Sequence, residues 1–238
     1  MIKVCLATNS VVREETMLAI EELMRLTPCE VQIARGRHFA DLHNILVCPD
    51  DQRTRYAKLT DKYSHYLSVD QDVVFTPAVV LDMLEADKDV ISAVHAMPDG
   101  RGLTCGRWID RRPGWLGDNM ADSTPPGVYR VDWASDSLML VKREVWEKLE
   151  RPLWRQVVLR AIEVGPGDVT TEVVDTTSPE IGLILNFLAH KIEVWAYRAK
   201  PGMLHYEWAP TEVTPVGTRL KTEFKPPMGW TGSQFPVV

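Results

Sequence analysis

The sequence predicts a single α/β domain built around one β-sheet. The chain has 238 residues, which suits one large domain. Hydrophobic residues make up 45% of it and charged residues 25%, as is typical of soluble globular proteins. Short apolar runs alternate with helical patterns over residues 1–95. Strand, helix, strand, helix in this order favours a parallel, doubly wound sheet.

The first half of the chain contains the clearest periodic segments. Residues 2–7 are apolar and rich in β-formers, and they end at a polar loop. Residues 13–26 carry apolar side chains at helical spacing, and Pro28 ends that helix. Pro77 stands where a helix tolerates proline, at its first position. We therefore expect strands at residues 2–7, 30–34, 66–69 and 90–94, and helices at residues 13–26, within 36–47 after a loop, at 51–63, and from residue 77 onward.

The second half of the chain is less regular. Residues 97–128 are rich in Gly, Pro, Arg and Asp with weak periodicity, and we interpret them as one long loop, of the kind that is often functional. Residues 168–178 are polar and rich in Thr. We expect a strand or strand pair at 131–141, helices at 143–149 and 179–188, a last strand at 192–197, and an irregular tail after residue 205.

Charge and cysteine usage restrict the class of protein. The net charge is -6, which disfavours nucleic acid as a general partner. The four cysteines are far apart in the sequence and form no C-x-x-C motif, so we expect a reducing compartment without disulfides. The N-terminus has no long apolar signal core, and no apolar run reaches the roughly 20 residues of a membrane span. These features predict a cytoplasmic enzyme.

A pair of carboxylates follows the strand at residues 66–69. Asp70 and Asp72 lie at the carboxyl end of this strand, where open α/β sheets bind ligands. Alternate residues of an extended segment point the same way, so both carboxylates can face one cation. Oxygen ligands suit Mg²⁺ or Mn²⁺, which would neutralise charge on a diphosphate leaving group. Asp-x-Asp also occurs by chance in turns and helix caps, and this alternative stays open.

The stretch around this pair resembles a known family. Residues 63–77, YSHYLSVDQDVVFTP, look like the D-x-D segment of GT-A glycosyltransferases, most closely the family 2-like enzymes of bacteria and phages. Four further segments resemble that family in the same order: residues 6–9 (LATN), 43–47 (HNILV), 136–146 (DSLMLVKREVW), and 178–181 with the segment that ends at 202–205 (GMLH). Three positions depart from the family pattern: His43 replaces its Arg, Pro179-Glu180 its Glu-Asp pair, and Asp136 or Ser137 its Gly.

The resemblance implies a GT-A (Rossmann-like) three-layer sandwich with a mixed, mainly parallel central sheet. The whole chain, residues 1–238, would be one domain. Residues 1–95 would form the nucleotide-sugar-binding half and residues 96–205 the acceptor-binding half, with residues 206–238 as a tail packed over the domain. The enzyme would be a hexosyltransferase of a bacterial cell or a phage-infected host cell.

The resemblance also implies the donor site. The reaction would be an inverting, metal-dependent transfer from a nucleoside diphosphate sugar, with a UDP-sugar favoured, to a hydroxyl of a saccharide or small-molecule acceptor. Mn²⁺ or Mg²⁺ would be held by three residues: Asp70, Asp72 and His205. The donor would contact Thr8, Asn9, Asn44, Asp70 and Gln71. The threonine and asparagines are equally suited to capping a helix or turn.

The acceptor side needs a general base to take the proton of the attacking hydroxyl. Glu180 is the first candidate, although an acid in the first turn of a helix also serves as a cap. Asp175 and Asp136 are the reserve candidates. Indole faces pack on sugars, so we expect acceptor contacts from residues in or near loops: Trp108, Trp115, Trp133, Asp136 and Trp208. Trp146, Trp154 and Trp195 lie in apolar patterns and are expected in the core.

Three other functions remain compatible with the sequence. A phage-type DNA glycosyltransferase acting on 5-hydroxymethyl pyrimidines would use the same chemistry, and the basic residues Arg101, Arg107, Arg111 and Arg112 favour it, whereas the acidic net charge does not. A nucleotidyltransferase also uses paired carboxylates, but it usually has a Gly-rich loop after the first strand, and residues 8–12 contain no glycine. An inactive sugar-binding module is the third alternative.

Overall fold

The computed structural model describes residues 1–9, 12–36, 38–48, 59–96, 102–109, 117–164, 170–201, 203–206, 211–213 and 219–221. The helices are α1 (Glu14–Leu26), α2 (Phe39–Val47), α3 (Pro77–Glu85), α4 (Arg143–Lys148) and α5 (Pro179–Ala189). The strands of the first half are β1 (Ile2–Thr8), β2 (Cys29–Arg35), β3 (His65–Asp70), β4 (Val73–Phe75), β5 (Val90–Val94), β6 (Cys105–Trp108) and β7 (Gly117–Asn119). The remaining strands are β8 (Gly127–Val131), β9 (Trp133–Ala134), β10 (Leu138–Lys142), β11 (Val158–Val164), β12 (Thr170–Thr176), β13 (Val194–Arg198), β14 (Leu204–Tyr206), β15 (Thr211–Val213) and β16 (Arg219–Lys221).

A seven-stranded mixed sheet forms the centre of the molecule, in the order β2-β1-β3-β10-β5-β13-β8. The neighbours β2-β1, β1-β3 and β5-β13 are parallel, as the βαβ pattern predicts. The expectation of a mainly parallel sheet was wrong, because β10 inserts antiparallel between β3 and β5, and β8 adds a third antiparallel pair at the edge. Strands from both halves of the chain therefore share one sheet, with β5 of the first half between β10 and β13 of the second.

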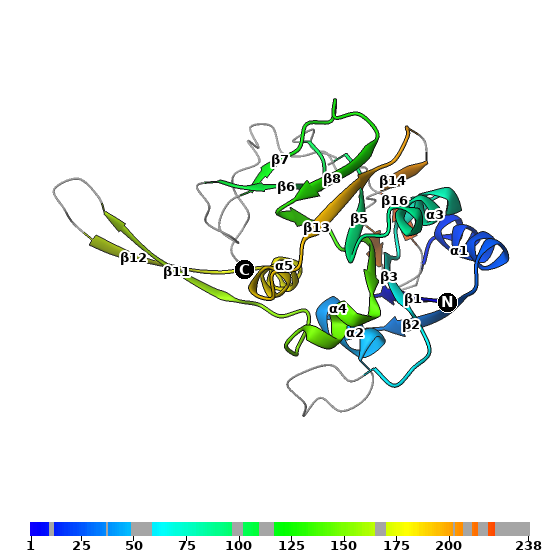
Figure 1. The fold of residues 1–238 in the computed structure, drawn as a ribbon, viewed down its shortest axis with the longest axis horizontal. Helices are drawn as coiled ribbons and strands as arrows, with labels where there is room; N and C mark the ends of the chain where they lie inside the picture. The colour runs from blue at the N-terminus through cyan, green and yellow to red at the C-terminus, as the bar shows by residue number, and fades with distance from the viewer. Residues whose placement is uncertain are drawn as a thin grey trace.

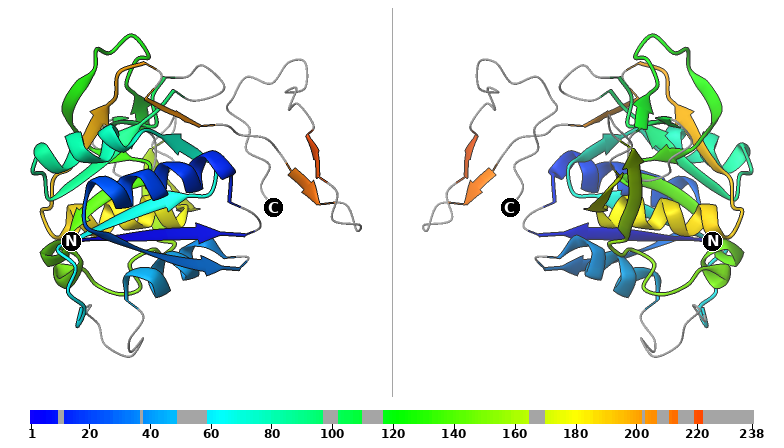
Figure 2. Two further views of the ribbon diagram at one scale, coloured as in Figure 1. Left: turned by 90° about the vertical axis from the view of Figure 1, so that its right-hand side faces the viewer. Right: turned by 90° about the vertical axis from the view of Figure 1, so that its left-hand side faces the viewer.

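Helices cover both faces of this sheet (Figure 2). Because successive side chains of a strand point to opposite faces, β1 sends Val4 and Leu6 to one core and Cys5 and Ala7 to the other. The first core packs against α1 and α3, and the second against α2, α4 and α5. Cys5 and Cys48 are buried, as their apolar surroundings predict. No helix in the described part of the chain is long and apolar enough to cross a membrane.

The central region corrects the expectation of one long loop at residues 97–128. Its described residues include β6, β7 and β8, and β6 is the middle strand of a small sheet with the order β7-β6-β9. Close packing against Trp133 fixes this sheet, since a Cβ at Gly106 or Gly117 would lie within about 3 Å of the Trp133 ring. Weak periodicity hid these strands because they are short and only partly buried.

Three further strand pairs were not expected from the sequence. The polar segment at residues 168–178 contributes β12, which pairs antiparallel with β11 in a hairpin that projects from the body (Figure 1). β14, which begins at Leu204, pairs antiparallel with β4. The region after residue 205 was expected to be irregular, yet β15 pairs with β16. A helix was expected at residues 51–63. Residues 59–63 are not helical, and residues 51–58 lie outside the described part.

Candidate functional site

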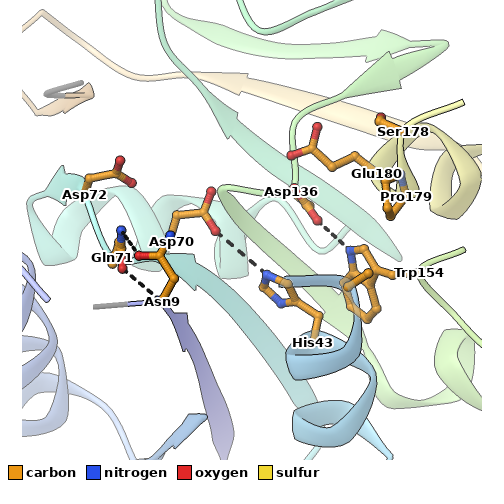
Figure 3. Close-up of a pocket in the computed structure, with 11 residues that line it drawn as sticks. Asn9, His43, Asp70, Gln71, Asp72, Asp136, Trp154, Ser178, Pro179 and Glu180 are labelled. Atoms are coloured by element: carbon orange, nitrogen blue, oxygen red, sulfur yellow. Dashed lines mark hydrogen bonds and ion pairs between the residues drawn. The ribbon is translucent and has the colours of Figure 1, made fainter. Parts of the chain in front are cut away.

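A pocket of about 400 Å³ opens where β1 and β3 end (Figure 3). The antiparallel β10 begins at this same edge, and the amide of Asp70 donates to the carbonyl of Ser137, just before that strand (2.9 Å). Asp136 therefore comes to lie at the same edge of the sheet as Asp70. The described lining residues are Asn9, Ala40, His43, Asp70, Gln71, Asp72, Asp136, Trp154, Ser178, Pro179 and Glu180. Four of these residues carry carboxylates.

The turn between the two aspartates is held by hydrogen bonds from the end of β1. The Thr8 hydroxyl donates to Oε1 of Gln71 at 2.6 Å, and the Asn9 amide donates to the same atom at 3.2 Å. Nε2 of Gln71 donates in return to Oδ1 of Asn9 at 3.1 Å. The amide of Arg13 and the hydroxyl of Thr16 both donate to the Gln71 carbonyl. The Gln71 side chain thus fixes the backbone that carries Asp70 and Asp72.

His43 connects this turn to the opposite wall. It projects from α2 and is only 2% exposed. Its Nε2 lies 3.8 Å from Oδ1 of Asp70, and its ring stacks on Trp154 with centroids 4.9 Å apart and planes inclined by 21°. The Trp154 indole then donates from Nε1 to Oδ2 of Asp136 at 2.5 Å. A continuous line of contacts therefore runs from Asp70 through two rings to Asp136 (Figure 3).

Glu180 approaches the pocket from the first turn of α5. Ser178 caps this helix by accepting from the Ile181 amide at 3.3 Å, and Pro179 occupies its first position. Although Glu180 as a residue is exposed, its carboxyl points back toward Asp136 (Figure 3). The Asp136 carboxylate raises the pKa of Glu180 well above its usual range, with burial of the carboxyl and the charge of Asp70 as further causes.

Burial and neighbouring charges also shift the pKa values of Asp70 and His43. Burial raises the pKa of Asp70, which the contact with His43 opposes and the charge of Asp136 reinforces. For His43, burial lowers the pKa, but its contact with Asp70 and the charge of Asp136 outweigh this, so that the net pKa is raised. The imidazole is therefore surrounded by groups that favour its charged form.

The segment that carries Trp154 is fixed against two helices. Asn44 of α2 donates from Nδ2 to the Trp154 carbonyl at 2.9 Å, and its Oδ1 accepts from the amides of Leu153 and Trp154 at 2.7 and 3.1 Å. Gly182 of α5 packs directly on the Arg155 backbone, where a Cβ would overlap the Arg155 carbonyl oxygen. Residues 153–155 therefore link α2, α5 and, through the indole, Asp136.

Several residues expected at the site from the sequence lie elsewhere. Thr8 is buried beneath the turn, where it bonds Gln71, and Asn44 uses its amide in the internal contacts just described; neither is among the lining residues. Asp175 lies exposed on the projecting hairpin, where its carboxylate accepts from the Thr176 amide at 2.7 Å. Trp108 and Trp133 pack on each other in the small sheet, with centroids 6.2 Å apart, and do not line the pocket.

Three expected site residues lie wholly or partly outside the described part of the chain. The backbone of His205 on β14 pairs with Val74 on β4, and Val74 follows Asp72 by two residues. The His205 side chain lies outside the described part. Trp115 and Trp208 lie outside the described residues altogether. Of the four arginines that favoured a DNA acceptor, Arg107 forms an ion pair with Asp132 at 3.2 Å, and Arg101, Arg111 and Arg112 are not described.

Sequence reasoning missed the two ring side chains that line the pocket, His43 and Trp154. His43 attracted attention only as a departure from a motif, and Trp154 was assigned to the core, where its ring is indeed buried. A helical histidine beside an asparagine carries no local signal for a ligand site. The two rings meet because segments about 110 residues apart in the sequence come into contact. The hydrogen bond from Asn44 to the Trp154 carbonyl is part of that contact.

The acidic turn has the ligand type, but not a complete ligand set, for a hard divalent cation. Mg²⁺ is usually held by one or two carboxylates together with substrate phosphates, and Asp70 and Asp72 supply such a pair. Among the side chains that the structure describes, no three His, Cys, Asp or Glu form a ready metal cluster. A cation at this turn would therefore need oxygen atoms from a ligand to complete its coordination.

The comparisons bear on the fold of the chain. Comparison with protein-family profiles and with curated proteins gives no match. The structure is similar to the crystal structure of A197 from STIV, with a TM-score of 0.53 and 14% sequence identity over 94% of this chain and 96% of that chain. At this identity the likeness concerns the fold alone. It extends over nearly the whole of both chains and defines this protein as a mixed α/β protein with a shared architecture.

Proposed function

We propose that this protein is a GT-A glycosyltransferase that transfers a sugar from a nucleoside diphosphate sugar, preferably a UDP-sugar, to a hydroxyl of a saccharide or small-molecule acceptor. The observation that carries the proposal is the arrangement of four carboxylates around one pocket. Asp70 and Asp72 stand at the end of a central strand, and Asp136 and Glu180 stand on the acceptor side. Sugar transfer by inversion needs charge neutralisation at the leaving group and a base for the nucleophile, and each pair would supply one of these.

The donor side would be formed by the turn at residues 70–72. Asp70 and Asp72 would hold Mn²⁺ or Mg²⁺ together with the donor diphosphate, and the bound cation would supply charge neutralisation for the leaving nucleotide. The His205 position on β14, next to β4, is compatible with a third ligand. Asn9 and Gln71 line the same side, and the amide N–H groups that their mutual contacts leave over would face the nucleotide.

On the acceptor side, Glu180 would act as the general base. A base works best when its pKa lies near the working pH, and the neighbouring Asp136 raises the pKa of Glu180 in that direction. The carboxyl points toward Asp136 from a capped helix start (Figure 3), and it would lie beside an acceptor hydroxyl bound in the pocket. Glu180 would accept the proton as the hydroxyl oxygen attacks the sugar from the face opposite the diphosphate.

The central sheet also supports the proposal. It is mixed, has helices on both faces, and places the acidic turn at the carboxyl ends of parallel strands. Open α/β sheets bind their ligands at this edge. Four carboxylates around the pocket also favour an acceptor other than a polyanion such as DNA.

The test is a screen of nucleotide sugars for Mn²⁺-dependent hydrolysis and transfer, beginning with UDP-sugars. Asp72→Asn should lower kcat/KM by about 100-fold or more, because a coordinating charge stabilises the transition state by several kcal/mol. A 100-fold loss corresponds to about 3 kcal/mol. Asp118→Asn makes the same chemical change at an exposed site on β7 and should leave the rate unchanged. Retained activity in Asp72→Asn, or no turnover of any nucleotide sugar, would contradict the proposal.

A further inference from the structure

The stacked rings of His43 and Trp154 lie between the two acidic sides of the pocket. His43 contacts Asp70 on the donor side, and Trp154 donates to Asp136 on the acceptor side. Both rings are almost fully buried, so neither offers a broad face to a sugar. Their position therefore calls for a role other than direct stacking on substrate.

We infer that His43 and Trp154 are positioning residues that together set the separation between the donor-side acid Asp70 and the acceptor-side acid Asp136. The inference rests on the proposed function. His43 orients the Asp70 carboxylate through Nε2, and Trp154 orients the Asp136 carboxylate through its indole N–H. The stack between the rings holds these two contacts at a fixed distance.

The surroundings of the pair explain why it is rigid enough for this role. On one side, Asn44 bonds the backbone of Leu153 and Trp154 to α2, the helix that also carries His43. On the other side, Gly182 packs α5 against Arg155, so the helix that carries Glu180 rests on the same segment. Trp146 adds a further ring contact to Trp154, with centroids 5.3 Å apart. The helices that carry His43 and Glu180 are thus both fixed against residues 153–155.

The two polar contacts should affect different steps. The separation of Asp70 and Asp72 from the acceptor decides whether a bound donor meets the hydroxyl at reacting distance, and misplacement by about 1 Å lowers rates by about 100-fold. Loss of the His43 contact should disturb Asp70 and hence donor binding. Loss of the indole N–H should disturb Asp136, and through it Glu180, and hence transfer to the acceptor.

Two substitutions separate these effects, because each keeps an aromatic ring in the stack and removes one polar contact. His43→Phe should weaken binding of the Mn²⁺–UDP complex by about tenfold, as expected for a contact to a charged group. Trp154→Phe should leave that dissociation constant within about twofold and lower kcat for transfer by about tenfold. Calorimetry measures the first quantity without turnover, and a coupled transfer assay measures the second.

Matched controls make the same changes away from the pocket. His65→Phe lies at the opposite end of β3, and Trp195→Phe lies on β13, where its ring faces Lys88. Both should leave nucleotide binding and transfer unchanged. The indole N–H resonance of Trp154, assigned by its loss in Trp154→Phe, should move in Asp136→Asn, which checks the hydrogen bond in the absence of any ligand.

The outcomes distinguish the two proposals. A binding loss in His43→Phe with a kcat loss in Trp154→Phe supports the positioning roles. The inference is overturned if both variants lose binding and transfer equally, or if the Trp154 indole N–H resonance does not shift in Asp136→Asn. Either result leaves the proposed function standing. If the unmodified protein binds no metal–nucleotide complex, the proposed function fails, and this inference fails with it.

Discussion

Glu180 and Asp136 carry two carboxyl groups close together in the pocket (Figure 3). Like charges at short range favour one shared proton, so the pKa of Glu180 lies well above its usual range. A general base acts in its deprotonated form. Activity should therefore rise with pH through a raised pKa rather than near the ordinary value of about 4.3 for a glutamate.

Removing the neighbouring charge tests this arrangement. Asp136→Asn eliminates the largest cause of the raised pKa of Glu180, so the acid limb of kcat/KM against pH should move to lower pH. Asp118→Asn, on the exposed β7, should leave the limb in place. An unchanged limb in Asp136→Asn would show that another group titrates. Glu180→Gln should lower kcat by about 100-fold or more, while exposed Glu22→Gln in α1 should not.

At the scale of elements, α5 owes its position to a glycine rather than to its apolar face alone. Gly182 lies inside the helix, where alanine ordinarily stabilises by about 1 kcal/mol through helix propensity. Here a Cβ would overlap the Arg155 carbonyl oxygen, which belongs to the backbone and has little freedom to move. The close approach of α5 to residues 153–155 thus requires the missing side chain.

The usual effect of replacing a helical glycine by alanine on the free energy of unfolding should therefore be reversed at Gly182. Gly182→Ala should lower the free energy of unfolding by about 1–3 kcal/mol, as overpacking does elsewhere. Urea denaturation measures the change. Ala189→Gly, at the exposed end of the same helix, reports the ordinary propensity effect and should cost about 1 kcal/mol or less. A stabilised Gly182→Ala protein would mean that α5 does not rest on the Arg155 backbone.

At the scale of the whole molecule, the central sheet combines strands from both halves of the chain. Outside the sheet, Asn44 joins them as well, because its amide makes three hydrogen bonds to residues 153 and 154 and a fourth to the Ala40 carbonyl. Removing these bonds leaves partly buried backbone groups without their partner. Such groups cost about 1–3 kcal/mol each when they are desolvated.

Asn44→Ala should therefore destabilise the protein by about 2–4 kcal/mol, since several bonds are lost at once. The effect should appear in urea denaturation. Exposed Gln32→Ala, on β2, is the control for loss of an amide and should be near neutral. Equal stabilities of Asn44→Ala and the unmodified protein would contradict this prediction.

The sequence predicted the local elements of the sheet region well. Apolar runs with β-branched residues gave β1, β2, β3 and β5 within one or two residues, and Pro77 and Pro179 marked the starts of α3 and α5. It missed β4, β6, β7, β14, β15 and β16, which have only three or four residues each, and periodicity is weak over so short a run. It also missed β11 and β12, which have seven residues each but pair only with each other in the projecting hairpin. Six of the residues that it named line the pocket: Asn9, Asp70, Gln71, Asp72, Asp136 and Glu180.

By itself, then, the sequence determined that an acidic turn follows a buried strand, because strand and turn preferences are local and Asp-Gln-Asp stands directly after an apolar run. Only the tertiary structure decided that Asp136 and Glu180 face this turn. That outcome requires β10 to enter the sheet antiparallel beside β3, and it requires the rings of His43 and Trp154 to meet across about 110 residues of chain. Long-range pairing depends on burial and register between distant segments, which no short stretch of sequence encodes.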